Sequence, residues 1–194
     1  MISRAKSFSE LSDAAVECRL CPRMKNCRAV LGTANGSLNS KIVFIAEAPG
    51  RFGAGKTGVP FQGDRSGNNF ETLISAAGLT RDEVFITNAV LCLPLKDGNN
   101  SKPISSEINN CLGFLQATLE LIRPCVVVTL GSVALEALNR IFKTRYKLSE
   151  IIACPQKLPG FTLLPLYHPS PRVIYTRRSI SKQKGDFKKI PALL

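Results

Sequence analysis

The sequence predicts a single α/β domain built on a mainly parallel sheet with helices on both faces. Four short, continuous apolar runs alternate with longer amphipathic segments along the chain. Continuous apolar runs are typical of strands that are buried on both faces, and their alternation with helices is typical of parallel sheets. A chain of 194 residues with 44% hydrophobic residues is long enough to build one sizeable core.

The first two strand–helix units occupy the middle of the chain. A strand over Lys41–Ala46 leads through a long loop to a helix over about Ser66–Ala77, which Gly78 ends. A second strand over Glu83–Val90 leads through a polar loop to a helix over about Ser105–Ile122. We expect the polar loop, residues 97–103, to be mobile.

The other two units follow in the C-terminal half. Cys125–Leu130 is a β-branched apolar run, and the helix after it begins at Gly131-Ser132 and ends near Phe142. Thr162–Tyr167 is the last predicted strand, and Ser179–Lys188 the last predicted helix. No repeat or low-complexity segment interrupts this order.

The loop after the first strand, Glu47 to Asp64, is the most informative stretch of the chain. It has a carboxylate at each end and is rich in glycine, so that backbone can approach a ligand closely. In open α/β sheets, ligands bind at the carboxyl ends of strands. Because Glu47, Asn88, Gly131 and His168 each lie near such an end, we expect them to meet around a pocket for a small flat molecule.

Within this loop, Gly50–Thr57 matches the phosphate-loop pattern, but the match is misleading. That motif needs a helix that begins at its Lys-Thr pair and directs amide groups at the phosphates. Here Gly58 and Pro60 follow at once, so we expect no helix to begin there. No later strand ends in an Asp that would hold magnesium, which argues against a nucleoside triphosphatase.

The chain is strongly basic, with a formal net charge of +12. Seven basic residues and one acidic residue fall between Arg172 and Lys189, so half of the surplus is in this short stretch. Such a cluster favours a partner with a phosphate backbone over a merely solvated face. A membrane partner fits less well, because the stretch has no large apolar face. No signal-peptide core or membrane-length apolar run is present, so we expect a cytoplasmic protein.

Seven cysteines in an intracellular protein argue for metal ligands or buried thiols instead of disulfides. Cysteines collected from separate places suit zinc or an iron–sulfur cluster. The set that we favour as ligands is Cys18, Cys21, Cys92 and Cys111. Spacing alone would also allow Cys27 to replace one member. We interpret Cys125 and Cys154 as small buried apolar residues.

His168 is the only histidine in the chain. A lone histidine is more often a satisfied structural residue than a functional one. Here it follows a buried strand and is fixed between Tyr167 and two prolines, which indicates that its ring has a defined direction.

Several short motifs occur in an order and spacing that are specific together. They are Cys18-x-x-Cys21, Ala46-Glu-Ala-Pro-Gly50, Thr57-Gly-Val-Pro-Phe61, Thr87-Asn88, Cys92, Cys111, Leu130-Gly131 and His168-Pro-Ser170. From Cys18 to about Lys188 the chain thereby resembles the uracil-DNA glycosylase superfamily, specifically its cluster-containing families 4 and 5.

The resemblance implies a three-layer α/β/α sandwich around a four-stranded, mostly parallel sheet. It implies a structural [4Fe–4S] centre on Cys18, Cys21, Cys92 and Cys111, with an N-terminal segment of about residues 1–40 packed on the single domain through it. The implied activity is hydrolysis of the N-glycosidic bond of uracil in DNA, the first step of base-excision repair. We therefore expect a monomer that acts on uracil-containing DNA near the nucleoid.

The resemblance also implies roles for the pocket residues. Phe61 would stack on the flipped base, the Asn88 amide would match the uracil edge, and His168 would donate to uracil O2. Gly50 and Ser170 fall in the motifs that bind substrate.

For DNA, Arg172 or Val173 would fill the stack that the base vacates, and the basic residues after them, including Arg177 and Arg178, would bind phosphates.

The chain is a mosaic of the two families. Glu47 matches family 4, where this position is acidic, whereas Gly53–Gly58 and Gln62–Gly67 look like family 5. Two carboxylates could therefore direct the catalytic water, and we favour Glu47 over Asp64, whose other role would be to cap the following helix. Family 5 members accept other deaminated bases such as hypoxanthine, so specificity stays open.

Three other interpretations remain. The chain could be a non-catalytic DNA-binding or damage-recognition module that a metal site of four cysteines stabilises. It could be a relative that captures uracil covalently through a loop histidine, but no such histidine is present. An electron-transfer protein is the weakest alternative, because no second cluster or flavin motif is visible.

Overall fold

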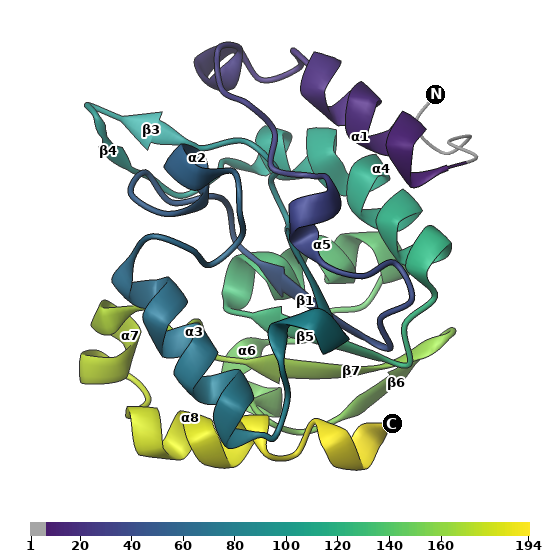
Figure 1. The fold of residues 1–194 in the computed structure, drawn as a ribbon, viewed down its shortest axis with the longest axis vertical. Helices are drawn as coiled ribbons and strands as arrows, with labels where there is room; N and C mark the ends of the chain where they lie inside the picture. Colours follow the sequence, from purple (N-terminus) through teal and green to yellow (C-terminus); the bar gives the residue numbers. More distant parts are fainter. Residues whose placement is uncertain (1–6) are drawn as a thin grey trace.

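The computed structural model describes residues 7–194, and residues 1–6, the start of the predicted N-terminal segment, lie outside the described residues. It confirms the α/β class (Figure 1). The central sheet has five strands in the order β2-β1-β5-β7-β6. Four of them are parallel to one another: β1 (Ile42–Ala46), β2 (Val84–Asn88), β5 (Val126–Leu130) and β7 (Phe161–Leu166).

The fifth strand, β6 (Gln156–Leu158), corrects the expected count of four. It pairs with β7 in the antiparallel direction and lies at the edge of the sheet. The sequence did not predict β6, because its three residues have a lysine at their centre and form no apolar run.

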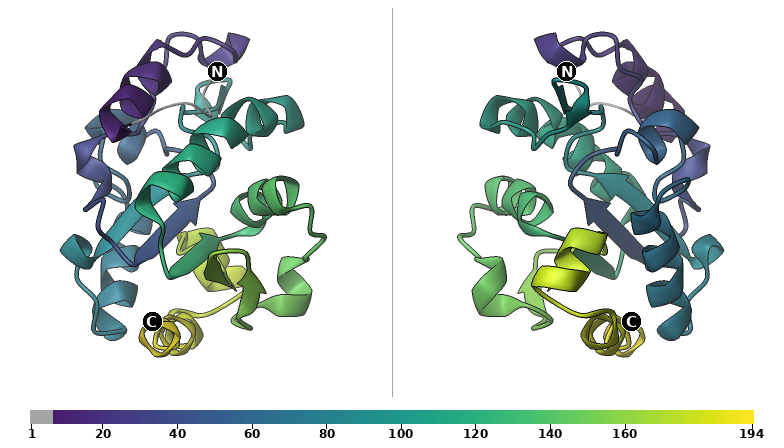
Figure 2. Two further views of the ribbon diagram at one scale, coloured as in Figure 1. Left: turned by 90° about the vertical axis from the view of Figure 1, so that its right-hand side faces the viewer. Right: turned by 90° about the vertical axis from the view of Figure 1, so that its left-hand side faces the viewer.

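Helices cover the sheet on both faces, which gives the three layers (Figure 2). One layer contains α1 (Phe8–Glu17), α4 (Ser105–Ile122) and α5 (Ser132–Phe142). The other contains α3 (Arg65–Ala76) and α8 (Ile180–Phe187). Successive residues of β1 alternate between the two cores, with Val43 in the first and Phe44 in the second.

The structure adds several short elements to the predicted ones. The N-terminal helix α1 begins at Ser7, whose side chain accepts a hydrogen bond from the Glu10 amide at 3.2 Å. The single helical turns and short helices are α2 (Ala54–Thr57), α6 (Leu148–Ile151) and α7 (Pro171–Thr176). The 3₁₀ turns are Pro22–Met24, Thr33–Asn35, Arg81–Glu83 and Pro191–Leu193.

The polar stretch that we expected to be a mobile loop forms a small hairpin. Strands β3 (Leu95–Lys96) and β4 (Asn99–Asn100) pair in the antiparallel direction around an Asp97-Gly98 turn. Both turn residues have positive φ, at 51° and 72°. An Asp-Gly pair with this backbone is a common two-residue hairpin turn, so the signal was present in the sequence.

Cys125 and Cys154 are exposed, which corrects their interpretation as buried thiols. Cys125 precedes the first residue of β5, and the buried part of that apolar run begins only at Val126. Cys154 lies in the turn between α6 and β6, outside both cores.

The topology places a crevice at the carboxyl ends of the strands, beside β1. The chain passes from β1 to β2 on one side, and β5 then lies on the other side of β1. Ligands bind outside the carboxyl ends of strands at such a switch point. Within the described residues, no helix combines the length and apolar character that a membrane crossing requires.

Candidate active site

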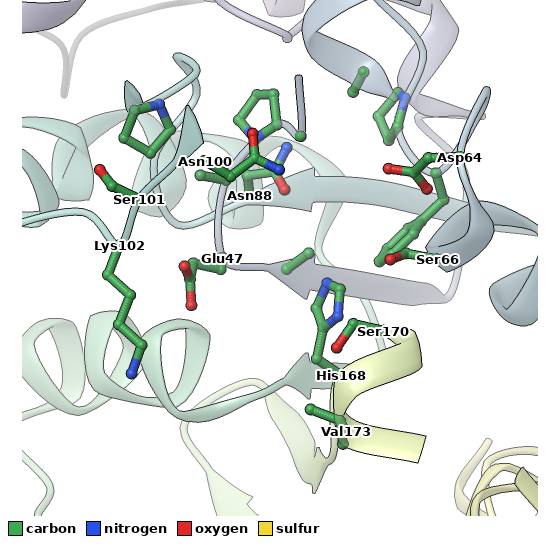
Figure 3. Close-up of a pocket in the computed structure, with 18 of the residues that line it drawn as sticks. Glu47, Asp64, Ser66, Asn88, Asn100, Ser101, Lys102, His168, Ser170 and Val173 are labelled. Carbon is green, nitrogen blue, oxygen red and sulfur yellow. The ribbon is translucent and has the colours of Figure 1, made fainter. Parts of the chain in front are cut away.

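A cavity of about 430 Å³ opens at the carboxyl ends of the parallel strands (Figure 3). Three of the four residues that the sequence placed at these ends meet there: Glu47 after β1, Asn88 at the end of β2, and His168 after β7. Gly131, after β5, is not one of the described residues that line the cavity. Phe61 and Asp64, from the glycine-rich loop, form a further wall. The predicted convergence of an acid, an amide, an aromatic ring and an imidazole is therefore present in the fold.

Glu47 is half-buried in this cavity and directly follows the buried strand β1. Its backbone carbonyl accepts a hydrogen bond from the Val90 amide at 3.1 Å, which fixes the strand end against the neighbouring segment. Burial raises the pKa of the Glu47 carboxyl, because the charged form loses water, and the positive charge of Lys102 opposes this effect.

Asn88 is the last residue of β2 and is only 5% exposed. No described residue forms a hydrogen bond with its side-chain amide, and Asn88 lines the cavity. Leaving a buried polar group unpaired is costly, so this amide is poised for a ligand with a complementary donor and acceptor.

Phe61 provides an aromatic wall whose position is fixed from behind. Its ring stacks on that of Phe70, with centroids 4.4 Å apart and planes within 6°. The His168 ring lies 5.6 Å away on a tilted plane. A Cβ at Gly67 would lie 2.7 Å from the Phe61 carbonyl carbon, so only glycine at position 67 allows this close approach.

His168 lies in the cavity wall beside the end of β5. A Cβ at Gly131 would be 3.6 Å from the His168 Cβ. The Asn69 side chain donates to the carbonyl of Pro169 at 2.9 Å and so ties the histidine loop to α3. Burial lowers the pKa of His168 to about 4, although the nearby Asp64 charge opposes this shift. The imidazole is therefore neutral at pH 7 and has one N–H to donate.

Asp64 has the capping role that the sequence allowed for it. One carboxylate oxygen accepts a hydrogen bond from the Gly67 amide at 2.9 Å, at the N-terminus of α3. The other oxygen, Oδ2, lies over Gly50 and Gly53, where an added Cβ would come within 3.3 Å and 2.6 Å of it. Asp64 thus lines the cavity while one of its oxygens is used for structure.

The phosphate-loop pattern does not form a phosphate-binding loop. The helical turn α2 ends at Thr57, and Gly58 follows with φ of 73°. Because Lys56 and Thr57 finish a turn instead of starting a helix, no helical amide groups point from them towards a ligand.

Sequence reasoning missed one wall of the cavity. Asn100, Ser101 and Lys102, from the segment after the hairpin, lie on the side of the cavity away from Asp64 (Figure 3). Ser66, at the start of α3, also lines the cavity. Only the Asp-Gly turn could have indicated that this polar stretch folds back onto the strand ends.

The cysteines of the predicted metal set gather at one place in the first core. Cys111 is buried, and Cys18, Cys21, Cys27 and Cys92 are partly buried against the same core. Burial, together with the smaller effect of the neighbouring thiolates, raises the pKa of Cys92 to about 12. Burial also raises the pKa of Cys111 to about 11.

This donor set suits a soft metal or an iron–sulfur cluster, because thiolates packed together out of water need a cation to balance them. In residues 7–194, however, the side chains do not form a group of three or more His, Cys, Asp or Glu in a metal-binding arrangement. The structure therefore supports the proximity of the thiols and leaves the ligand set as a prediction.

Of the residues assigned to DNA, Arg172 and Val173 line the cavity and belong to α7. Arg177 is exposed. Arg178 differs, because its guanidinium binds both carboxylate oxygens of the buried Asp186, at 2.8 Å and 2.6 Å. That pair joins the segment after α7 to α8 and leaves Arg178 the least available of the three arginines for a phosphate.

A parallel α/β/α sandwich with an acid, an amide and a neutral imidazole around a cavity at the carboxyl ends of its strands is the arrangement of an α/β protein that binds a small ligand there. The model of the uracil DNA glycosylase superfamily matches residues 33–192. The chain belongs to this superfamily.

Curated relatives extend the match over most of the chain. It is 33% identical to the type-4 uracil-DNA glycosylase of Thermotoga maritima, over 88% of this chain and 85% of that protein. It is 32% identical to the type-4 uracil-DNA glycosylase of Archaeoglobus fulgidus, over 97% and 94%. It is 28% identical to the type-5 uracil-DNA glycosylase of Pyrobaculum aerophilum, over 88% and 86%. Similarity to both types agrees with the mosaic of family 4 and family 5 motifs.

Proposed function

We propose that this protein is a DNA glycosylase that hydrolyses the N-glycosidic bond of uracil in DNA. The observation that carries the proposal is the meeting of Glu47, Asn88, Phe61 and His168 around one cavity in a chain of this superfamily. A base inside a duplex is out of reach, so the target nucleotide must first leave the stack, at a cost of roughly a few kcal/mol.

Recognition of the base would fall to Phe61 and Asn88. Stacking on an aromatic ring is worth roughly 1–3 kcal/mol per base. The Asn88 amide would accept from uracil N3–H and donate to O4, a pattern that cytosine presents inverted. Its lack of a partner within the described part of the chain supports this role.

His168 would stabilise the leaving base. As the glycosidic bond breaks, negative charge develops on uracil O2, and the neutral imidazole would donate its N–H to that atom. A fixed donor of this kind is worth about 3–4 kcal/mol of the barrier. The depressed pKa of His168 supports a neutral donor and not an imidazolium.

Glu47 would act on the sugar side of the bond. As a carboxylate it would orient a water molecule towards C1′ and favour the positive charge that the sugar acquires. Its position directly after β1 supports Glu47 over Asp64, one of whose oxygens already caps α3.

The cysteine centre would be a [4Fe–4S] cluster, held by Cys18, Cys21, Cys92 and Cys111, with zinc as the alternative. The names type-4 and type-5 of the relatives support the cluster. Such a centre would supply structure, by joining the N-terminal segment to the domain, and the chain's own residues would carry the chemistry.

On the DNA side, Arg172 or Val173 would enter the stack that the base leaves, and Arg177 would contact a phosphate. The protein would work as a monomer on chromosomal DNA in the cytoplasm. The high net charge supports a polyanionic partner.

The deciding experiment is an excision assay on duplexes that carry uracil, hypoxanthine, xanthine or thymine at one position, followed by alkali to cut abasic sites. We expect cutting at uracil and none at thymine, and cutting at hypoxanthine would extend the specificity towards that of family 5. Tight binding without any alkali-sensitive site would instead support the non-catalytic DNA-binding module.

A further inference from the structure

The cavity wall that the sequence did not predict, residues 100–102, is held in place by an arginine. This arginine belongs to the cysteine-containing segment, residues 18–27. Arg23 lies two residues after Cys21, and its guanidinium reaches across to the segment that follows the hairpin. Nη1 donates to the Ser101 hydroxyl at 2.7 Å, and Nη2 donates to the Lys102 carbonyl at 2.9 Å. Both of these partners line the cavity.

The same guanidinium is itself fixed by a buried carboxylate. Arg23 Nε and Nη2 donate to the two oxygens of Glu107 at 2.5 Å and 2.6 Å. Glu107 is 3% exposed and also accepts from the Ile104 amide at 2.8 Å, at the N-terminus of α4. The paired geometry of two guanidinium nitrogens on one carboxylate is rigid, so Arg23 is a fixed support and not a floating surface charge.

A second arginine holds the other end of this wall. The Arg51 amide donates to the Asn100 side-chain oxygen at 2.9 Å, and the Arg51 guanidinium donates to the Gly98 carbonyl. The segment 98–102 is therefore tied at both ends, although it lies at the surface and has no apolar residue of its own.

The charged residue that this anchoring holds in the cavity wall is Lys102. Lys102 is exposed, and no described residue forms a hydrogen bond or ion pair with its Nζ. Its side chain extends along the wall on the Glu47 side of the cavity (Figure 3). The other charged or titratable groups that line the cavity are Asp64, His168 and Arg172.

We propose that Lys102 is the charge partner that keeps Glu47 ionised for catalysis, and that Arg23 is the positioning residue that fixes Lys102 there. Glu47 has to be a carboxylate to orient water, yet its burial favours the neutral acid. Of the cations that line the cavity, Lys102 is the one whose charge favours the ionised form of Glu47. This inference deepens the proposed function and rests on it for the catalytic part.

The first test measures Glu47 directly and needs no activity. The protein is labelled with ¹³C at glutamate side-chain carboxyls, and Glu47 is assigned by comparison with Glu47→Gln. We expect Lys102→Met to move the Glu47 titration to higher pH and Lys102→Arg to restore it, because loss of a nearby positive charge favours the neutral acid. An unchanged titration in Lys102→Met overturns the proposal.

The second test follows single-turnover excision of uracil from pH 5.5 to pH 8. For Lys102→Met we expect the excision rate at pH 5.5 to be about threefold or more below that of wild type, because more of the Glu47 carboxyl is then protonated. At pH 8 we expect the rate to be less than about twofold below wild type. Substrate affinity should be unchanged at both pH values. A uniform loss that appears only in affinity would make Lys102 a phosphate contact and would also overturn the proposal.

The role of Arg23 is tested with two variants, one at Arg23 and one at its partner Ser101. Arg23→Met leaves Glu107 buried without its partner and can fail to fold, whereas Ser101→Ala removes only the contact at the cavity wall. We expect Ser101→Ala to shift the Glu47 titration in the same direction as Lys102→Met, but by less, with iron content per chain unchanged.

Arg19→Met is the matched control. Arg19 belongs to the same segment, but among the described residues its guanidinium bonds only to the nearby carbonyls of Val16 and Cys18, at 2.7 Å and 2.8 Å. We expect no shift there, and an equal shift in Arg19→Met and Ser101→Ala would overturn the role of Arg23. A wild-type protein that excises no uracil would remove the proposed function, while the titration would still decide the Lys102–Glu47 pair.

Discussion

Two carboxylates face the cavity, and their surroundings divide their roles. One Asp64 oxygen caps α3, whereas no described residue forms a hydrogen bond with the Glu47 carboxylate at the end of β1. We expect Glu47→Gln to slow single-turnover excision by about tenfold or more, because the amide neither orients water as a base nor stabilises a positive sugar. DNA affinity, measured by fluorescence anisotropy, should change little. Full activity in this variant together with loss in Asp64→Asn would reverse the assignment.

His168 combines a neutral ring with a fixed position. We expect His168→Ala to keep its circular-dichroism spectrum and to slow base release by a factor of about several hundred, the equivalent of 3–4 kcal/mol. A wild-type rate of base release would remove the proposed electrostatic role.

The same residue should also make stability depend on pH. The unfolded chain protonates His168 near pH 6.5, but the folded protein does so only near pH 4. The unfolded state therefore binds more protons between these values, and the unfolding free energy falls as the pH drops through this window. We expect the difference in unfolding free energy between pH 7 and pH 4, measured by urea unfolding, to be smaller in His168→Ala than in wild type by about 1–3 kcal/mol.

At this scale the sequence predicted which residues meet, because parallel strands bring their carboxyl ends to one edge whatever lies between them. It could not predict Lys102 and Ser101, because their place depends on contacts between residues far apart in the chain, such as those of Arg23 with Glu107 and Ser101. Nor could it predict the exposure of Cys125, which depends on where the strand begins.

At the scale of elements, the close contact between α3 and the Phe61 backbone holds the aromatic wall. We expect Gly67→Ala to destabilise the protein by about 1–3 kcal/mol and to weaken excision, because the new methyl group must push the Phe61 carbonyl away. The measurements are urea unfolding and single-turnover excision.

Gly185→Ala is the control for this prediction. Gly185 also lies inside a helix, α8, but no atom lies within 4 Å of an added Cβ. Its replacement should stabilise the fold by up to about 1 kcal/mol, since alanine is the better helix former, and should leave excision unchanged. Equal effects of the two substitutions would show that the Phe61 contact is unimportant.

The predicted elements were those whose burial can be read from a single run of residues. Strands β1, β2, β5 and β7 are buried along nearly their whole length, so each appears as a continuous apolar stretch. The missed elements are short, and tertiary contacts fix them: β6 depends on pairing with β7, and the hairpin on its arginine anchors.

At the scale of the whole molecule, the positive charge should act on DNA through particular residues. We expect Arg177→Gln to make the slope of log affinity against log salt shallower by about 0.9, because it removes one phosphate contact. Arg178→Gln should instead destabilise the fold by about 3 kcal/mol, because Asp186 loses its partner in a buried position. Salt titrations of DNA affinity and urea unfolding separate these effects. A shallower salt slope in Arg178→Gln with unchanged stability would contradict the structural role of Arg178.

The predicted cysteine centre would join separate parts of the molecule. Its predicted ligands come from the N-terminal segment, from the segment after β2, and from α4. If they hold a [4Fe–4S] cluster, the purified protein should be brown, with about four iron and four sulfide per chain. Colourless protein with stoichiometric zinc would contradict the cluster.

The fifth thiol nearby, Cys27, makes the ligand set testable. Its Sγ lies 3.4 Å from the Leu93 carbonyl, as a thiol donating to that oxygen would. A thiol in that role keeps its proton, whereas a ligand must lose it. We therefore expect Cys27→Ser to keep the iron and Cys92→Ser to lose it. Hydrogen exchange should then show earlier opening of residues 18–27 in Cys92→Ser, because loss of the cluster leaves only the polar contacts with α4, such as the Arg23–Glu107 ion pair, and the packing of α1 to hold that segment among the described residues. Loss of iron in Cys27→Ser with iron retained in Cys92→Ser would exchange the two residues in the ligand set.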